Sequence, residues 1–313
     1  MQQQTRLTEE GLLKLSIAAT IAIAGFGIAV GLITRSFAIT FDGIYALLDA
    51  VMSGVALIVV GLIKSHAAAT MANKRLERRF SYGFWHLEPM VLGLNGILLV
   101  GVAAYGLMNA VIVLRDGGRM LSFDVALIYA LVATVVCFCV AAIGARANRT
   151  IRSAFVALDV RGWVMSGGIS AALVVAFGAA MAVEGTALAW ILPFVDPAAL
   201  AIVCLIVIPL PFPTIRQAFS DILLITPDTL RADVDRVAAA IAAAEGFTGF
   251  RTYVARIGRA RQIEIYFIVP TGRPAVPLEQ WDALRDRIGH QIGEEGPDRW
   301  LSIIFTTDPE WTA

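Results

Sequence analysis

The sequence predicts a mainly α membrane protein, in which a six-transmembrane-helix bundle is followed by a small α+β domain. Of the 313 residues, 58% are hydrophobic and only 16% are charged, whereas soluble domains are about 25% charged. Long apolar runs fill the first two thirds of the chain and then stop. The formal net charge is zero, so we expect no nucleic-acid partner.

Six apolar runs are long enough to be transmembrane helices, because a helix needs about 20 apolar residues to cross the hydrocarbon core. In chain order they cover residues 12–34, 37–63, 85–114, 123–145, 155–183 and 190–212. The first run is followed by no small-residue cleavage pattern, so we interpret it as a retained span. We therefore expect residues 1–213 to form the transmembrane domain.

The basic residues in the loops predict the orientation of these spans. Eight lie in the loops after the second and fourth spans, and three lie in the loops after the first and third. The eight are Lys64, Lys74, Arg75, Arg78, Arg79, Arg146, Arg149 and Arg152, and the three are Arg35, Arg115 and Arg119. Since basic residues favour the cytoplasmic side, we expect both termini in the cytoplasm. The three glutamines near the start of the sequence and the lack of an organellar signal lead us to expect a bacterial-type inner membrane.

Residues 214–313 differ in composition, with 11 basic and 14 acidic side chains and no run long enough to span a membrane. We expect them to form a cytoplasmic domain. Hydrophobic periodicity predicts helices over 228–245 and 278–294 and strands over 250–257, 262–269 and 301–306. The order αββαβ is typical of a small α+β sandwich with a three-stranded sheet.

Carboxylates inside the predicted spans indicate function, because an aspartate near the bilayer centre costs a few kcal/mol and usually faces a functional cavity. Asp42 and Asp49 are seven residues apart in the second span, so they share one helix face with Tyr45 between them. If the second and fifth spans touch, Asp49 faces Asp159 and Asp42 faces Ser166. Two carboxylates at one level can hold a divalent cation or share a proton. The alternative is that these aspartates are paired or snorkelling structural groups.

Other residues of the predicted spans are expected to have structural roles. We expect glycines of the fifth span to permit close helix approach, aromatic residues at span ends to form interfacial belts, and acidic residues at span ends to act as caps. The glycines are Gly162, Gly167 and Gly168, the belt residues include Trp85, Trp190 and Tyr129, and the caps are Glu88, Asp124 and Asp196.

Two segments carry a resemblance to a known family: SFAITFDGIYALLD at residues 36–49 and FSYGFWHLE at residues 80–88. Together with the six spans, the basic loop after the second span and the αββαβ domain, they make the chain similar to the cation diffusion facilitator (cation efflux) family. The resemblance implies a ferredoxin-like, metallochaperone-like cytoplasmic domain and a homodimer. It also implies export of a divalent metal ion in exchange for protons, with no bound cofactor.

The resemblance also implies a metal site, which the family builds from a His or Asp and an Asp four residues later on each of spans 2 and 5. The matching positions here are Tyr45 and Asp49, and Gly162 and Ser166. Because only Asp49 keeps the usual ligand, we expect Asp159 and Asp42 to complete an oxygen-rich site. Such a site suits Mn2+, Fe2+ or Mg2+ better than Zn2+, with Zn2+ and Co2+ as further candidate substrates.

We interpret the chain as a secondary active transporter in which a cytoplasmic cation binds Asp49 and Asp159 and displaces protons. An ATP-driven pump is disfavoured, because the chain has no G-x-x-x-x-G-K-[ST] run that would bind ATP. The alternative is a non-transporting membrane sensor or assembly protein that keeps the fold with a degenerate metal site. We do not expect an enzyme, since no nucleophile and base are found at a helpful spacing.

Overall fold

The computed structural model describes residues 9–67, 80, 83–151, 154–296 and 298–312. Five residues of the topology prediction lie outside them: Lys74, Arg75, Arg78, Arg79 and Arg152. The chain forms two compact units, one of Met1–Val55 and Asn95–Phe212 and the other of Ala56–Leu94 and Pro213–Ala313.

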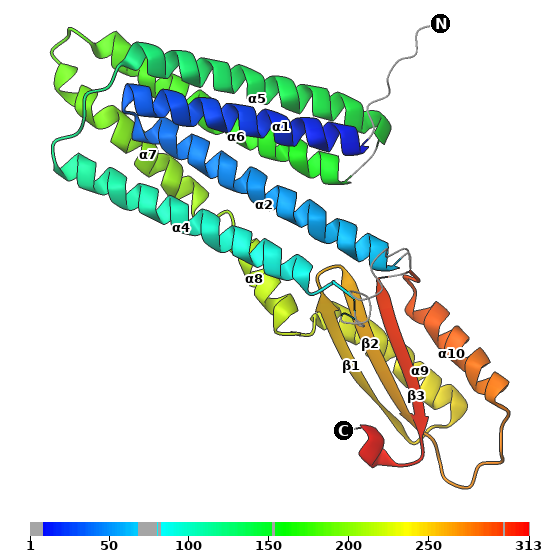
Figure 1. Ribbon diagram of the computed structural model, residues 1–313. Helices are drawn as coiled ribbons and strands as arrows, with labels where there is room; N and C mark the ends of the chain where they lie inside the picture. Colours follow the sequence, from blue (N-terminus) through cyan, green and yellow to red (C-terminus); the bar gives the residue numbers. More distant parts are fainter. Residues whose placement is uncertain (1–8, 68–79, 81–82, 152–153, 297, 313) are drawn as a thin grey trace, which may run out of the picture. The chain divides into compact units, whose positions relative to one another are not determined.

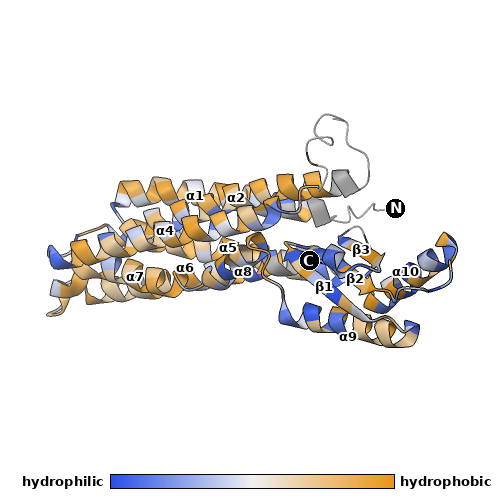
Figure 2. Cartoon of the chain, turned by 90° about the horizontal axis from the view of Figure 1, so that it is seen from below, coloured by the Kyte–Doolittle hydropathy of each residue, from blue (hydrophilic) through white to orange (hydrophobic). Residues whose placement is uncertain are grey.

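The first unit is a helical bundle (Figure 1). Its elements are α1 (Glu9–Thr34), α2 (Phe37–Ala67), α4 (Leu87–Arg115), α5 (Phe123–Ile151), α6 (Ala154–Val183), η1 (Ala189–Ile191) and α7 (Leu192–Val207). The end of α2 and the start of α4 belong to the second unit. Helix α6 packs against α5, α7 and α1. Apolar residues cover these helices (Figure 2). Six helical segments of the described chain are long and apolar enough to cross a membrane, which confirms the predicted bundle.

Helices α1 and α2 are joined by a tight turn that two sequence features allow. Arg35 adopts a left-handed φ of 60°, and the hydroxyl oxygen of Ser36 accepts the N–H of Ile39 at 3.2 Å, which caps α2. The two helices approach closely at Gly31 and Gly43. A Cβ on Gly31 would lie 2.6 Å from the backbone nitrogen of Thr40, so the contact requires glycine.

The prediction for the glycines of α6 was right at one position and wrong at two. A Cβ on Gly167 would lie 3.2 Å from Cys137 and Phe138 of α5, so this glycine does permit close approach. Around Gly162 and Gly168, no atom of the described residues lies within 4 Å of such a Cβ, and both glycines are exposed, so neither makes a close helix contact within the described chain.

The sixth apolar run is not one continuous helix. It begins with the 3-10 turn η1, continues as α7, and breaks after Val207. A turn over residues 208–211 follows, and α8 (Phe212–Ile222) begins after it. Proline residues at 209 and 211 explain the break, because proline removes a helix hydrogen bond and clashes with the preceding turn.

The second unit contains a small α+β layer structure. After α8 come α9 (Asp228–Glu245), β1 (Gly249–Ile257), β2 (Ala260–Ile268), α10 (Leu278–Ile292), β3 (Arg299–Thr306) and η2 (Pro309–Thr312). The described strands form one sheet of order β1-β2-β3, antiparallel between β1 and β2 and parallel between β2 and β3. The predicted αββαβ order is confirmed, with strand ends within about two residues of the prediction.

Helices α9 and α10 supply the core of this layer together with one face of the sheet. Alternate residues of β2, namely Ile263, Ile265 and Phe267, are fully buried there. Val234 of α9 and Ile288 of α10 pack in the same cluster. The period of two in the strand and of three to four in the helices is the pattern from which the sequence predicts these elements.

Within the second unit, the start of α4 is bound to the turn between β1 and β2. Arg259 donates from Nε to Glu88 at 2.9 Å and from Nη2 at 3.1 Å, and both side chains are less than a quarter exposed. The hydrogen bond to Glu88 raises the pKa of Arg259, so the guanidinium stays charged. Gly258 has a φ of 60°, and a Cβ there would lie 3.0 Å from the Glu88 carboxylate.

We expect this pair to be measurable as a coupling between two side chains. In a double-mutant cycle of Glu88→Ala and Arg259→Ala, thermal unfolding should give a coupling free energy of about 1–2 kcal/mol, because the contact is bidentate and partly buried. Arg251→Ala, at an exposed position of β1, is the matched control and should change stability by less than about 0.5 kcal/mol. Additive effects of Glu88→Ala and Arg259→Ala would contradict the prediction.

Candidate cation site

Asp49 lies near the middle of α2, and its side chain is exposed in this structure. The amide of Asn95 in α4 donates from Nδ2 to Asp49 Oδ1 at 3.4 Å. This distance is longer than the usual 2.7–3.2 Å of an N–H to oxygen bond, so the contact is weak. The Asp49 carboxylate is therefore held loosely and has lone pairs available for a cation.

Asp42, two turns earlier on α2, is held more firmly. The phenol of Tyr129 in α5 donates to Asp42 Oδ2 at 2.9 Å. Tyr129 is only 1% exposed and lies in the core of the bundle. The interpretation of Tyr129 as a belt residue was wrong, because its ring is buried between helices and its hydroxyl is used by an intramembrane carboxylate.

Asp159 of α6 is bound to α1 through a short chain of hydrogen bonds. The Ser16 hydroxyl donates to Asp159 Oδ1 at 2.7 Å and accepts the Trp163 indole N–H at 2.7 Å. Ser16 and Trp163 are buried, whereas Asp159 is half-buried. One carboxylate oxygen is thus positioned by α1, which leaves the other oxygen available to a ligand.

Asp49 and Asp159 lie within electrostatic range of each other, as do Asp49 and Tyr45. Gly162 and Ser166 on α6 are both exposed. Among the described residues, no group of three or more His, Cys, Asp or Glu side chains is close enough together to hold a metal ion. Any cation bound here would need neutral oxygen ligands, such as hydroxyl, phenol or amide groups, beside the two carboxylates.

Asn95 and Ser16 are polar neighbours of the aspartates that were not predicted from the sequence. The Oδ1 atom of Asn95 is buried and, within the part of the chain that the structure describes, has no hydrogen-bond partner. Leaving such an atom unpaired costs about 1–3 kcal/mol. A signal was present for both, because an amide or hydroxyl within an apolar run is unusual, but Asn95 and Ser16 lie outside the second and fifth spans, in which the site was expected.

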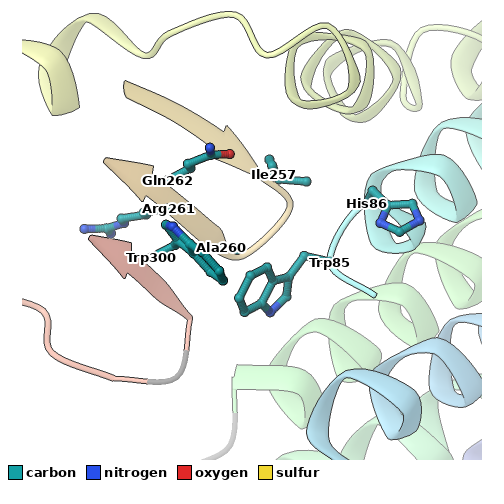
Figure 3. Close-up of a pocket in the computed structure, with 7 residues that line it drawn as sticks. All are labelled: Trp85, His86, Ile257, Ala260, Arg261, Gln262 and Trp300. Atoms are coloured by element: carbon teal, nitrogen blue, oxygen red, sulfur yellow. The ribbon is translucent and has the colours of Figure 1, made fainter. Parts of the chain in front are cut away.

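A separate pocket in the second unit has a different character (Figure 3). It lies between the segment before α4 and the sheet, and its lining residues are Trp85, His86, Ile257, Ala260, Arg261, Gln262 and Trp300. The ring of His86 also stacks on Phe80 at 6.3 Å between centroids. Among the described residues the lining contains no carboxylate, in contrast to the intramembrane aspartates.

Comparison with known proteins agrees with the arrangement of the spans. Residues 13–223, more than half of the chain, match the cation efflux transmembrane domain. The chain belongs to the cation efflux family. Two similar proteins are the metal cation efflux system protein CzcD of Cupriavidus metallidurans and the cation efflux system protein CzcD of an Alcaligenes species. Each is 23% identical over 256 residues, which cover 80% of this chain and 74% of the relative.

Membership of the cation efflux family establishes the general class of this protein. The protein is an integral membrane protein, and the family is one of transporters rather than enzymes. The match begins at residue 13, inside α1, and ends at residue 223, just after α8. It therefore includes every aspartate of the candidate site.

Proposed function

We propose that this cation efflux protein exports a divalent metal ion from the cytoplasm in exchange for protons, with a substrate site formed by Asp49 of α2 and Asp159 of α6. The observation that carries the proposal is the electrostatic proximity of these two carboxylates inside apolar helices. An uncompensated pair of charges in a membrane is costly, and a bound divalent cation or protons would neutralise it. The names of the relatives, which describe metal cation efflux, support the same substrate class.

The proposed site is rich in oxygen. Its candidate ligands are Asp49, Asp159, Tyr45, Ser166 and Asp42, the last of which also accepts the Tyr129 hydroxyl. Carboxylate, phenol and hydroxyl oxygens favour Mn2+, Fe2+ or Mg2+ over Zn2+, which prefers nitrogen and sulfur ligands. We therefore rank Mn2+ and Fe2+ above Co2+ and Zn2+ as substrates.

Three further features belong to the proposal. Both termini lie in the cytoplasm, because the loops after the second and fourth spans hold most of the basic residues. The host membrane is a bacterial inner membrane. The working form is a homodimer, as the resemblance to the family implies.

Metal transport by the purified protein in proteoliposomes tests the proposal. With Mn2+ on the side of the cytoplasmic domain, we expect saturable metal movement, accompanied by proton movement in the opposite direction and abolished when the pH gradient is reversed. A fluorescent pH indicator and a metal indicator measure the two fluxes. Absence of flux for Mn2+, Fe2+, Co2+, Zn2+ and Mg2+ would contradict transport and favour the sensor or assembly alternative.

A further inference from the structure

Asn95 carries an unpaired polar atom at a place where such an atom is costly. It lies in the apolar helix α4, and its side chain is half-buried. Among the described residues, its Oδ1 is the one buried side-chain oxygen or nitrogen without a hydrogen-bond partner. Buried polar groups in proteins are nearly always paired, so an exception requires an explanation.

The position of this amide indicates what its oxygen can do. The other amide atom, Nδ2, lies 3.4 Å from Asp49 Oδ1. Asp42 and Asp159, by contrast, accept hydroxyl groups at 2.9 Å and 2.7 Å. Asp49 therefore has the longest of these three contacts, and Asn95 is the polar group of α4 that stands beside it.

An asparagine amide offers two different atoms to such a site. A half-turn about the Cβ–Cγ bond exchanges the oxygen and the nitrogen, because the two are nearly equal in size. After that rotation the oxygen faces the side of the Asp49 carboxylate. Amide oxygens are uncharged, hard ligands that Mg2+, Ca2+ and Mn2+ accept readily and softer ions accept poorly.

We propose that Asn95 is a ligand of the transported cation, and that its amide oxygen binds the ion beside the Asp49 carboxylate and favours hard over soft divalent cations. This inference rests on the proposed function and adds α4 to the helices that form the site. It also supplies a neutral oxygen to a place where no cluster of three His, Cys, Asp or Glu side chains is found among the described residues.

Calorimetric binding of Mn2+ and Cd2+ to the purified full-length protein tests this assignment. Asn95→Leu, which keeps the size but removes the oxygen, should weaken Mn2+ binding about tenfold or more and Cd2+ binding by less than about threefold. Asn95→Asp, which keeps an oxygen at the same place, should restore Mn2+ binding. Asn109→Leu, a matched change at another half-buried asparagine of α4, should leave both affinities unchanged.

The ratio of the two affinities separates a ligand from a structural residue. Equal weakening for Mn2+ and Cd2+ without rescue by Asn95→Asp would overturn the assignment, as would wild-type affinities in a folded Asn95→Leu protein. Thermal unfolding without metal shows that each variant is folded. If the wild-type protein binds neither ion, the proposed function itself fails, whereas failure confined to the Asn95 variants leaves that function standing.

Discussion

Replacing Asp49 by asparagine is expected to lower the initial rate of cation transport about 100-fold or more. In the proposed site the Asp49 carboxylate is the charged ligand, and its hydrogen bond to Asn95 is weak. Losing a charged ligand costs about 3 kcal/mol of binding free energy, which corresponds to a factor of about 100 in affinity for the cation. The amide introduced by Asp49→Asn still offers an oxygen to the Asn95 side chain, so the contact between these two residues can be kept while the charge is lost.

A control for this experiment is Asp124→Asn, since Asp124 is exposed in the first turn of α5. That variant should transport at the wild-type rate. Both proteins are reconstituted at equal density, and initial rates are measured at several metal concentrations. If the Asp49→Asn protein keeps more than about a tenth of the wild-type rate, the role assigned to Asp49 is wrong.

Replacing Asp196 by alanine is expected to destabilise the fold more than any other single change proposed here, by about 2–4 kcal/mol. Asp196 lies in α7 and is 1% exposed. Its carboxylate accepts the Ser36 hydroxyl at 2.5 Å and the backbone N–H of Phe37 at 3.0 Å. It thereby caps α2 from another helix, and Arg119 lies within electrostatic range.

The Asp196 and Ser36 variants should lose different amounts of folding stability. Removal of the side chain leaves buried donors at the start of α2 without an acceptor, whereas Asp196→Asn keeps one oxygen and should lose less. Ser36→Ala removes a single hydroxyl and should lose about 1 kcal/mol. The apparent unfolding temperature in detergent, followed by size-exclusion chromatography after heating, ranks the variants. An unfolding temperature of Asp196→Ala equal to that of Asp124→Ala would contradict the prediction.

Much of the architecture could be predicted from the sequence, for physical reasons. A membrane span needs a long apolar run, and a helix and a strand of the α+β layer bury residues at different periods, so both patterns are visible in one dimension. The break after Val207 is less visible, because the run from 190 to 212 stays apolar across it. Prolines at 209 and 211 were the available signal.

The partners of the aspartates could not be predicted, because they depend on how helices far apart in sequence pack. Asp159 is bound by Ser16, 143 residues away, and Asp42 by Tyr129, 87 residues away. A tyrosine near a span end is usually an interfacial residue, and that tendency led to the wrong interpretation of Tyr129. Asp196 was expected to be an interfacial cap; it does cap a helix, but it is buried, and the helix that it caps is α2 rather than its own.

Asp49 and Asp159 are proposed to hold one exported cation together, and a calorimetric double-mutant cycle tests this pairing most directly. Mn2+ binding is measured for the wild-type protein, for Asp49→Asn, for Asp159→Asn and for the double variant. We predict that each single variant loses nearly as much affinity as the double variant, because either carboxylate alone is insufficient. Mn2+ binding at wild-type affinity in both single variants would contradict the claim.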